Sequence, residues 1–128
     1  MSKTQALRAL IYSLLQTLPG QTYHRMAPDR AATPYKTFSL ARIDLSDSTV
    51  DNFDLCVDLI DLSPDPKTVE GMADELEALL NVANLPQDAI LPTFFRASRY
   101  PVEESDRHIQ HLQLHFDVQL YETNTEEE

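Results

Sequence analysis

HLQLHFDVQLY, residues 111–121, shows the clearest structural pattern in the chain. Apolar and polar residues alternate through it without a break, and strict alternation is typical of a β-strand with one covered and one exposed face. We therefore predict a strand here. Its covered face carries the five apolar residues Leu112, Leu114, Phe116, Val118 and Leu120.

Three histidines lie in or beside this strand, at a spacing that would suit a metal site on a helix: His108, His111 and His115. In a strand, residues four apart are separated by about 13 Å, at ~3.3 Å per residue. Two imidazoles that far apart cannot share a zinc ion, because Zn–N bonds are only about 2.0–2.1 Å long. We therefore expect no metal and no cofactor, and we place His111 and His115 on the exposed face, as candidates for a subunit interface.

Two helices are predicted from apolar residues at helical spacing. The first covers residues 6–18, with Ser2 or Thr4 as its cap and Pro19-Gly20 as its end. The second covers residues 67–84 and contains Gly71, which costs about 1 kcal/mol relative to alanine and is tolerable where a helix packs closely on a sheet.

The remaining ordered segments are predicted to be strands. They cover residues 23–25, 35–45, 53–62 and 93–100, with a bulge near Ala41–Arg42 and a loop bracketed by Pro86 and Pro92. The class is α+β, a mixed and mainly antiparallel sheet of four to five strands covered on one face by two helices. We expect residues 1–123 to form a single domain and residues 124–128 a disordered acidic tail.

Composition narrows the function. The net charge of −11, from 21 acidic and 10 basic residues, argues against specific binding to nucleic acid, which requires a basic surface. No apolar run reaches the length of a membrane span, and the N-terminal segment lacks the features of a signal peptide. A single cysteine, Cys56, suits a reducing compartment. We expect synthesis in the cytoplasm and no membrane partner.

No catalytic motif is present. The chain has two glycines and neither lies in a phosphate-binding loop, and the GxSxG and HExxH patterns are absent. Cys56 sits between apolar neighbours, which favours a buried structural thiol over a nucleophile. The acidic residues Asp58, Asp61 and Asp65 are better explained as a solvated strand end and turn than as a cation site. We expect no enzymatic activity.

The loop between residues 25 and 35 is a candidate interaction surface. It carries Arg25 and Arg30, and it is flanked by Tyr23 and Tyr35. Arginine and tyrosine are enriched at the centres of protein interfaces. An ordinary solvated loop has the same composition, so this assignment rests on the residue types alone.

Taken in order, these segments resemble the tail-completion proteins, or tail terminators, of long-tailed bacteriophages. The similar segments are LRALIYSLLQTL, YHRMAPDRAATPY, FDLCVDLIDL, TVEGMADELEALL and the ending RYPVEESDRHIQHLQLHFDVQLYE. The resemblance spans residues 5–122. It implies a structural protein without catalytic residues, which forms a hexameric ring that caps the tail tube and joins the tail to the head.

The same resemblance implies three partners: further copies of the chain, the tail tube protein and a head–tail connector protein. It also implies a location at the head-proximal end of the tail in the virion, after assembly in the host cytoplasm. Two alternatives stay open. One is a small metal- or ligand-binding enzyme domain built around His111 and His115, and the other is a head-completion protein on the head side of the connector.

Overall fold

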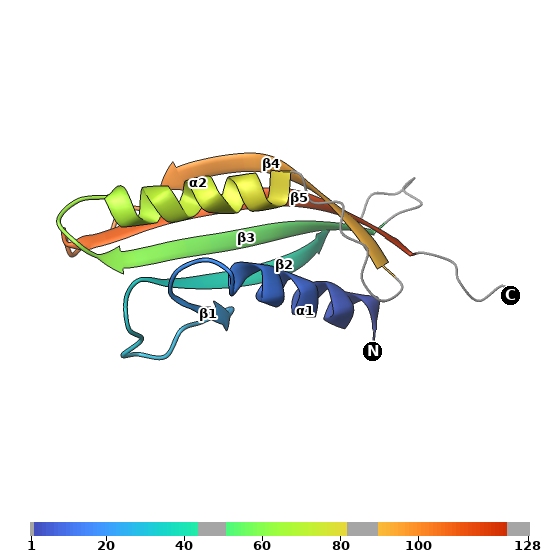
Figure 1. Ribbon diagram of the computed structural model, residues 1–128, viewed down its shortest axis with the longest axis horizontal. Helices are drawn as coiled ribbons and strands as arrows, with labels where there is room; N and C mark the ends of the chain where they lie inside the picture. The colour runs from blue at the N-terminus through green and yellow to red at the C-terminus, as the bar shows by residue number, and fades with distance from the viewer. Residues whose placement is uncertain (1, 44–50, 82–89, 123–128) are drawn as a thin grey trace, which may run out of the picture.

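The computed structural model describes residues 2–43, 51–81 and 90–122, and these form two helices and five strands. Along the chain the elements are α1 (Lys3–Leu15), β1 (Gln21–His24), β2 (Tyr35–Ile43), β3 (Asp51–Leu62), α2 (Lys67–Asn81), β4 (Ile90–Pro101) and β5 (Ile109–Glu122). The strands form one sheet in the order β1-β2-β3-β5-β4 (Figure 1). Among the described strands, only the β1–β2 pair is parallel. The predicted α+β class is therefore confirmed.

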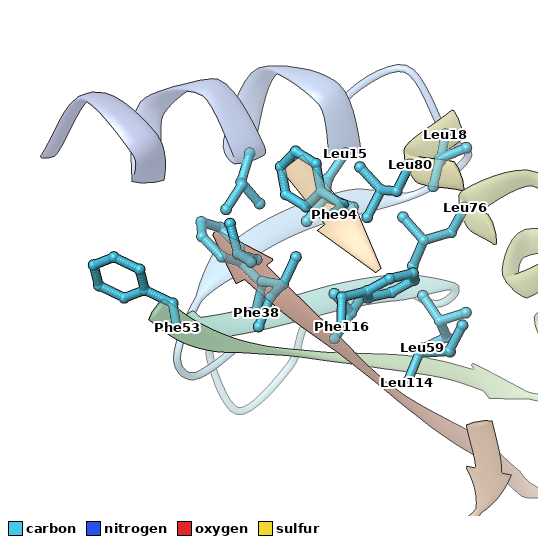
Figure 2. Close-up of a cluster of buried hydrophobic side chains, with 14 of the residues drawn as sticks. Leu15, Leu18, Phe38, Phe53, Leu59, Leu76, Leu80, Phe94, Leu114 and Phe116 are labelled. Atoms are coloured by element: carbon cyan, nitrogen blue, oxygen red, sulfur yellow. The ribbon is translucent and has the colours of Figure 1, made fainter. Parts of the chain in front are cut away.

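The hydrophobic core lies between the two helices and one face of the sheet. The predicted alternation of β5 is confirmed, since its five apolar residues are all buried and include Phe116 at 1% exposure. Leu55 on β3 lies directly opposite Phe116, and the neighbouring residues of β3 continue the same face. Figure 2 shows Phe116 and Leu114 of β5 and Leu59 of β3 pointing toward leucines of α1 and α2.

Helix α1 begins where one of the two predicted caps places it. The hydroxyl of Ser2 accepts a hydrogen bond from the backbone N–H of Gln5 at 3.1 Å, and the Gln5 side chain accepts one from the Ser2 backbone N–H at 2.9 Å. This reciprocal pair satisfies two amides that the first helical turn leaves unpaired. The helix ends at Leu15, earlier than predicted, although Leu18 remains buried in the core.

Helix α2 begins at Lys67, as predicted, and is described to Asn81, so the predicted end at residue 84 lies outside the described residues. Its buried stripe is Val69, Met72, Ala73, Leu76 and Leu80. The reason expected for Gly71 is wrong. Gly71 is exposed, and a Cβ atom there would meet nothing within 4 Å, so close packing on the sheet does not explain the glycine.

The predicted bulge in β2 is wrong. Strand β2 pairs with β3 in one continuous register, from Tyr35 opposite Ile60 to Ile43 opposite Asn52. Ile43 is an exposed apolar residue at the end of the strand and does not require a change of face. Residues 44 and 45, which the prediction included, lie outside the described residues.

The register shift lies instead in β4, between Arg96 and Ser98. An extra residue in one strand reverses which side chains face the core. Phe94 is therefore buried in the core before the shift, whereas Arg99 is on the helix-covered face after it and pairs with Asp74 of α2 at 2.8 Å. Pro92, expected in a loop, lies within β4, where an edge strand tolerates proline.

A buried lysine was not predicted. Lys36 is on the core side of β2 with 0% exposure, and its Nζ donates to the carbonyls of Leu18, Pro19 and Gly20 at 3.3, 2.9 and 2.6 Å. Burial lowers the pKa of Lys36 to about 8. This side chain fixes the turn between α1 and β1 to the sheet.

Among the described helices, none combines the length and the apolar character that crossing a membrane requires.

Candidate interaction surface

Four of the six predicted interface residues share one surface. We call the helix-free side of the sheet the outer face, and the strand register places Tyr23, Tyr35, His111 and His115 on it. Tyr35, Ile60 and His111 lie side by side across β2, β3 and β5. The rings of Tyr23 and Tyr35 meet edge to face, with centroids 6.0 Å apart. Neighbouring strands therefore present an aromatic pair and two imidazoles on the same side.

Arg25 and Arg30, the other two predicted residues, lie away from the histidines. Both are exposed, at the edge of the sheet that β1 forms, and β2 and β3 separate them from β5. Arg25 has a positive φ of 74°, and its backbone N–H donates to the carbonyl of Phe38 at 2.8 Å. The structure therefore divides the predicted residues into an outer-face group and an edge group.

His111 lies between two carboxylates. Its Nε2 is 2.6 Å from Asp58 Oδ1 on β3, and its Nδ1 is 2.7 Å from Glu104 Oε2 in the preceding turn. The hydrogen bond to Asp58 raises the pKa of His111, burial opposes this rise, and the hydrogen bond to Glu104 adds to it. Burial alone would raise the pKa of Asp58, but its hydrogen bonds with His111 and Gln113 leave that pKa below the ordinary value.

His115 lies four residues further along β5 on the same face, with Gln113 between the two histidines. Its Nδ1 lies 3.1 Å from the carboxylate of Asp54, and its Nε2 lies 2.9 Å from Gln113 Oε1. The ring of Tyr100 stacks on it, with centroids 6.0 Å apart, and the Tyr100 hydroxyl donates to Gln113. The imidazoles of His111 and His115 thus each have their own oxygen partners. Within the described residues, no three His, Cys, Asp or Glu side chains are arranged to hold a metal ion.

Cys56 lies between these two clusters on β3. Burial raises the pKa of its thiol to about 12, with the charges of Asp58 and Asp54 adding to the effect. A thiol with that pKa stays protonated at neutral pH and is a poor nucleophile, because the thiolate is the reactive form. Internally hydrogen-bonded histidines and aromatic rings therefore cover the outer face, and Cys56 is a half-buried, unreactive thiol on it rather than a fully buried one.

The outer-face cluster leads to a prediction about pH. A folded-state pKa of His111 above its ordinary 6.5 means that the imidazolium stabilises the fold fully below pH 6.5, and that this contribution is lost as pH rises through the folded value. We expect wild type to exceed His111→Gln in unfolding free energy by about 1–2 kcal/mol near pH 5.5 and by less near pH 8.5. Urea unfolding at both pH values measures the difference. His108→Gln, at an exposed position, is the control and should show little effect.

A groove beside α1 was missed by the sequence analysis. It has a volume of about 730 Å³ and lies between α1 and the β1–β2 pair, lined among others by Arg8, Tyr12, His24 and Phe38. The His24 ring lies 5.1 Å from the Phe38 ring, between centroids. Burial lowers the pKa of His24, and the positive charges of Arg8 and Arg25 lower it further. The groove is therefore apolar at its base and positive at its rim.

The signal that could have revealed this groove is the distribution of charge along the sequence. Residues 1–43 contain six Lys or Arg and one acidic residue, a formal charge of +5, whereas residues 44–128 contain four Lys or Arg and twenty acidic residues, a formal charge of −16. Such asymmetry between parts of a chain indicates a charged interaction surface. The net charge of the whole chain conceals it.

The fold is similar to that of a solved virion protein chain, although the sequence itself has no match. No protein-family model and no curated protein matches the sequence. Among solved structures, a chain from the "Virion of native gene transfer agent (GTA) particle" has a similar fold, with a TM-score of 0.67 and 19% sequence identity. The match covers 91% of this chain and 90% of that chain. At this identity the likeness establishes a shared fold over nearly the whole length of both chains.

Proposed function

We propose that this protein is a structural component of a long-tailed, phage-like virion and acts there as a tail terminator. Copies of the chain form a ring, a hexamer in the related proteins, that caps the tail tube at its head-proximal end. The ring then provides the surface that a head–tail connector protein joins. Assembly takes place in the host cytoplasm, and neither a cofactor nor a specific nucleic-acid contact is required.

The observation that carries this proposal is the fold shared with a chain of a virion particle over nine-tenths of both lengths. The order of sequence segments gives separate support, because it resembles tail terminators across residues 5–122. The backbone geometry and the residue pattern are independent properties of the chain. They agree on a virion protein, and the sequence pattern adds the more specific role.

The chemistry of the described residues favours a structural role over the enzymatic alternative. The raised pKa of Cys56 removes its thiol as a nucleophile at neutral pH. His111 has both ring nitrogens facing carboxylate oxygens of the same chain, so its polar atoms are already engaged. A general base needs a free nitrogen within hydrogen-bond reach of the substrate proton. The outer face is therefore better suited to contact another protein surface.

The test is deletion of the gene in a particle-producing strain, followed by electron microscopy of the lysate. A tail terminator stops tube growth, so its loss should give abnormally long tails without heads. Expression of the wild-type gene from a plasmid should restore joined particles with tails of normal length. Complete tails of normal length without the gene would contradict the proposal, and tail-less heads with separate normal tails would indicate the head-completion alternative.

The same complementation assay tests the proposed contact residues. We propose that Tyr23, Arg25, Arg30 and Tyr35 at the β1 side, with His111 and His115 on the outer face, contact neighbouring subunits or the tail tube. Arg30→Glu reverses an exposed charge in a loop and should leave the monomer folded. It should restore fewer joined particles than wild type. Restoration equal to wild type would remove Arg30 from the contact surface.

A further inference from the structure

We propose that copies of this chain associate head to tail, with the groove beside α1 of one copy receiving the acidic side of helix α2 of the next. The groove is the one lined by Arg8, Tyr12, His24 and Phe38, with Arg25 beside it. The acidic side of α2 consists of Glu70, Asp74 and Glu77. This inference rests on the proposed ring and names the surfaces that build it.

The two surfaces lie in different parts of the molecule. In Figure 1, α1 and β1 lie below β3, whereas α2, β4 and β5 lie above it. Helix α1 carries two basic residues and no acidic one, whereas α2 carries four acidic residues and one lysine. A contact that joins two different surfaces repeats from copy to copy and closes into a ring when the rotation between copies permits.

The groove has the composition of a helix-binding site. Tyr12, which is 37% exposed, provides apolar surface, and Phe38 closes the base of the groove with only 1% exposure. Because the pKa of His24 is lowered, its imidazole is neutral near pH 7, and the positive charge comes from Arg8 and Arg25. Neither arginine forms an ion pair with another described residue, so both are available to an incoming carboxylate.

The acidic side of α2 complements this charge. Glu70, Asp74 and Glu77 follow one another at helical spacing and share one side of the helix. Arg99 pairs with Asp74 at 2.8 Å and with Glu77 at 3.4 Å, so one guanidinium serves two carboxylates. Glu70 is exposed and has no ion pair among the described residues. Glu70 and Asp74, whose side chain is 71% exposed, therefore present carboxylates that complement the two arginines.

Pairing through the sheet edges is a weaker explanation for association. Strand β4 forms one edge, but Pro92, Pro101 and the register shift at residues 96–98 interrupt its row of hydrogen-bonding groups. Prolines and bulges at an edge oppose pairing with another sheet. Strand β1 forms the other edge and has only four residues. Charge and groove complementarity therefore favour contact through α1 and α2.

A charge-swap experiment tests the contact. Arg8→Glu makes the groove rim more acidic, and Glu70→Lys makes the side of α2 less acidic. In each variant alone, the substituted side chain therefore faces a charge of the same sign on the neighbouring copy. We expect each to weaken self-association by about tenfold or more in sedimentation at low salt, because like charges at an interface are unfavourable. An equimolar mixture should recover assembly, since each groove then meets an oppositely charged α2.

Matched variants control for net charge. Arg107→Glu and Glu103→Lys make the same charge changes at exposed positions in the turn before β5, and should assemble like wild type. Circular dichroism verifies that each variant is folded. If a charge reversal fails to fold, the neutral variant Arg8→Gln or Glu70→Gln replaces it. Each neutral variant should also associate more weakly than wild type. Raising the salt concentration should weaken wild-type assembly, because ions screen exposed charges.

Three results would overturn the inference. The first is assembly of both charge reversals at wild-type strength. The second is failure of two folded variants to recover when mixed, and the third is a wild-type chain that remains monomeric at its highest soluble concentration. None of these results decides the proposed function, which the gene deletion tests separately through tail length. Long headless tails combined with insensitivity to the charge swap would retain the tail-terminator role and reject this interface.

Discussion

Replacing Phe116 by alanine should lower the free energy of unfolding by about 3–5 kcal/mol. The side chain is 1% exposed and lies in the middle of β5, opposite Leu55 of β3 and Arg96 of β4. Figure 2 places it at the centre of the core cluster. The change removes the whole aromatic ring from between the sheet and the helices. The resulting cavity is costly because the surrounding strands cannot close around it.

Equilibrium unfolding in urea measures this effect, and Phe95→Ala is the matched control. Phe95 lies on the adjacent strand β4, but its side chain is 48% exposed. Its replacement should change the unfolding free energy by less than about 1 kcal/mol. If Phe116→Ala also loses less than about 1 kcal/mol, then Phe116 is not a core residue and the assignment of faces in β5 is wrong.

The sequence was sufficient to predict β5 and β3 because their burial is governed by simple periodicity. Phe116 and Leu55 each alternate with polar neighbours. In a sheet covered on one side, that pattern allows only one choice of the buried face. The helices were predicted for the same reason, with the cap at Ser2 as a local signal that does not depend on distant residues. Features determined by local pattern were therefore predictable.

Features determined by distant partners were not predictable. Ile43 breaks the alternation of β2, and a bulge was the local explanation, yet the strand continues in register with an exposed isoleucine at its end. The sequence around Arg99 did not indicate that its side chain faces α2. The register shift that turns it inward depends on pairing with β5. Lys36 is polar by type, and its burial depends on carbonyls contributed by a turn some sixteen to eighteen residues earlier.

The candidate surface shows the same division. Alternation alone placed His111 and His115 on the exposed face of β5, and the structure confirms that placement. Their partners, Asp58 and Asp54, come from a strand more than fifty residues earlier, and no spacing in the sequence indicates such pairs. The groove beside α1 depends on how Arg8 and His24 approach one another across a turn. Only the uneven charge distribution was visible beforehand.

Gly20→Ala should lower the free energy of unfolding by about 3 kcal/mol or more. Gly20 has a φ of +86°, in the left-handed region, where an alanine costs about 1–2 kcal/mol. A Cβ atom there would also lie 2.4 Å from the carbonyl oxygen of Pro34 and 2.9 Å from its carbonyl carbon. Because both neighbours are backbone atoms, the chain itself has to move. Overpacking of this kind adds about 1–3 kcal/mol.

The movement would also disturb a buried charge. The carbonyl of Gly20 accepts a hydrogen bond from Lys36 Nζ at 2.6 Å, the shortest of the three that hold this ammonium group. A buried ammonium that loses a hydrogen-bond partner keeps its desolvation cost without the compensating contact. The turn also leads directly into β1, whose first residue, Gln21, pairs with Tyr35. The substitution should therefore loosen the β1 edge as well as lower the overall stability.

Gly71 provides the control, because its replacement by alanine should change the unfolding free energy in the opposite direction. Gly71 lies in the exposed part of α2, where an added Cβ meets nothing within 4 Å, so Gly71→Ala should raise the unfolding free energy by about 0.5–1 kcal/mol. Urea unfolding of wild type and both variants measures the three unfolding free energies. The chemical change is the same at the two sites, so a difference in sign reflects the local structure. A neutral or stabilising Gly20→Ala would mean that the turn adopts another conformation. The contact between Lys36 and the turn would then have to be abandoned, together with the groove that β1 helps to form.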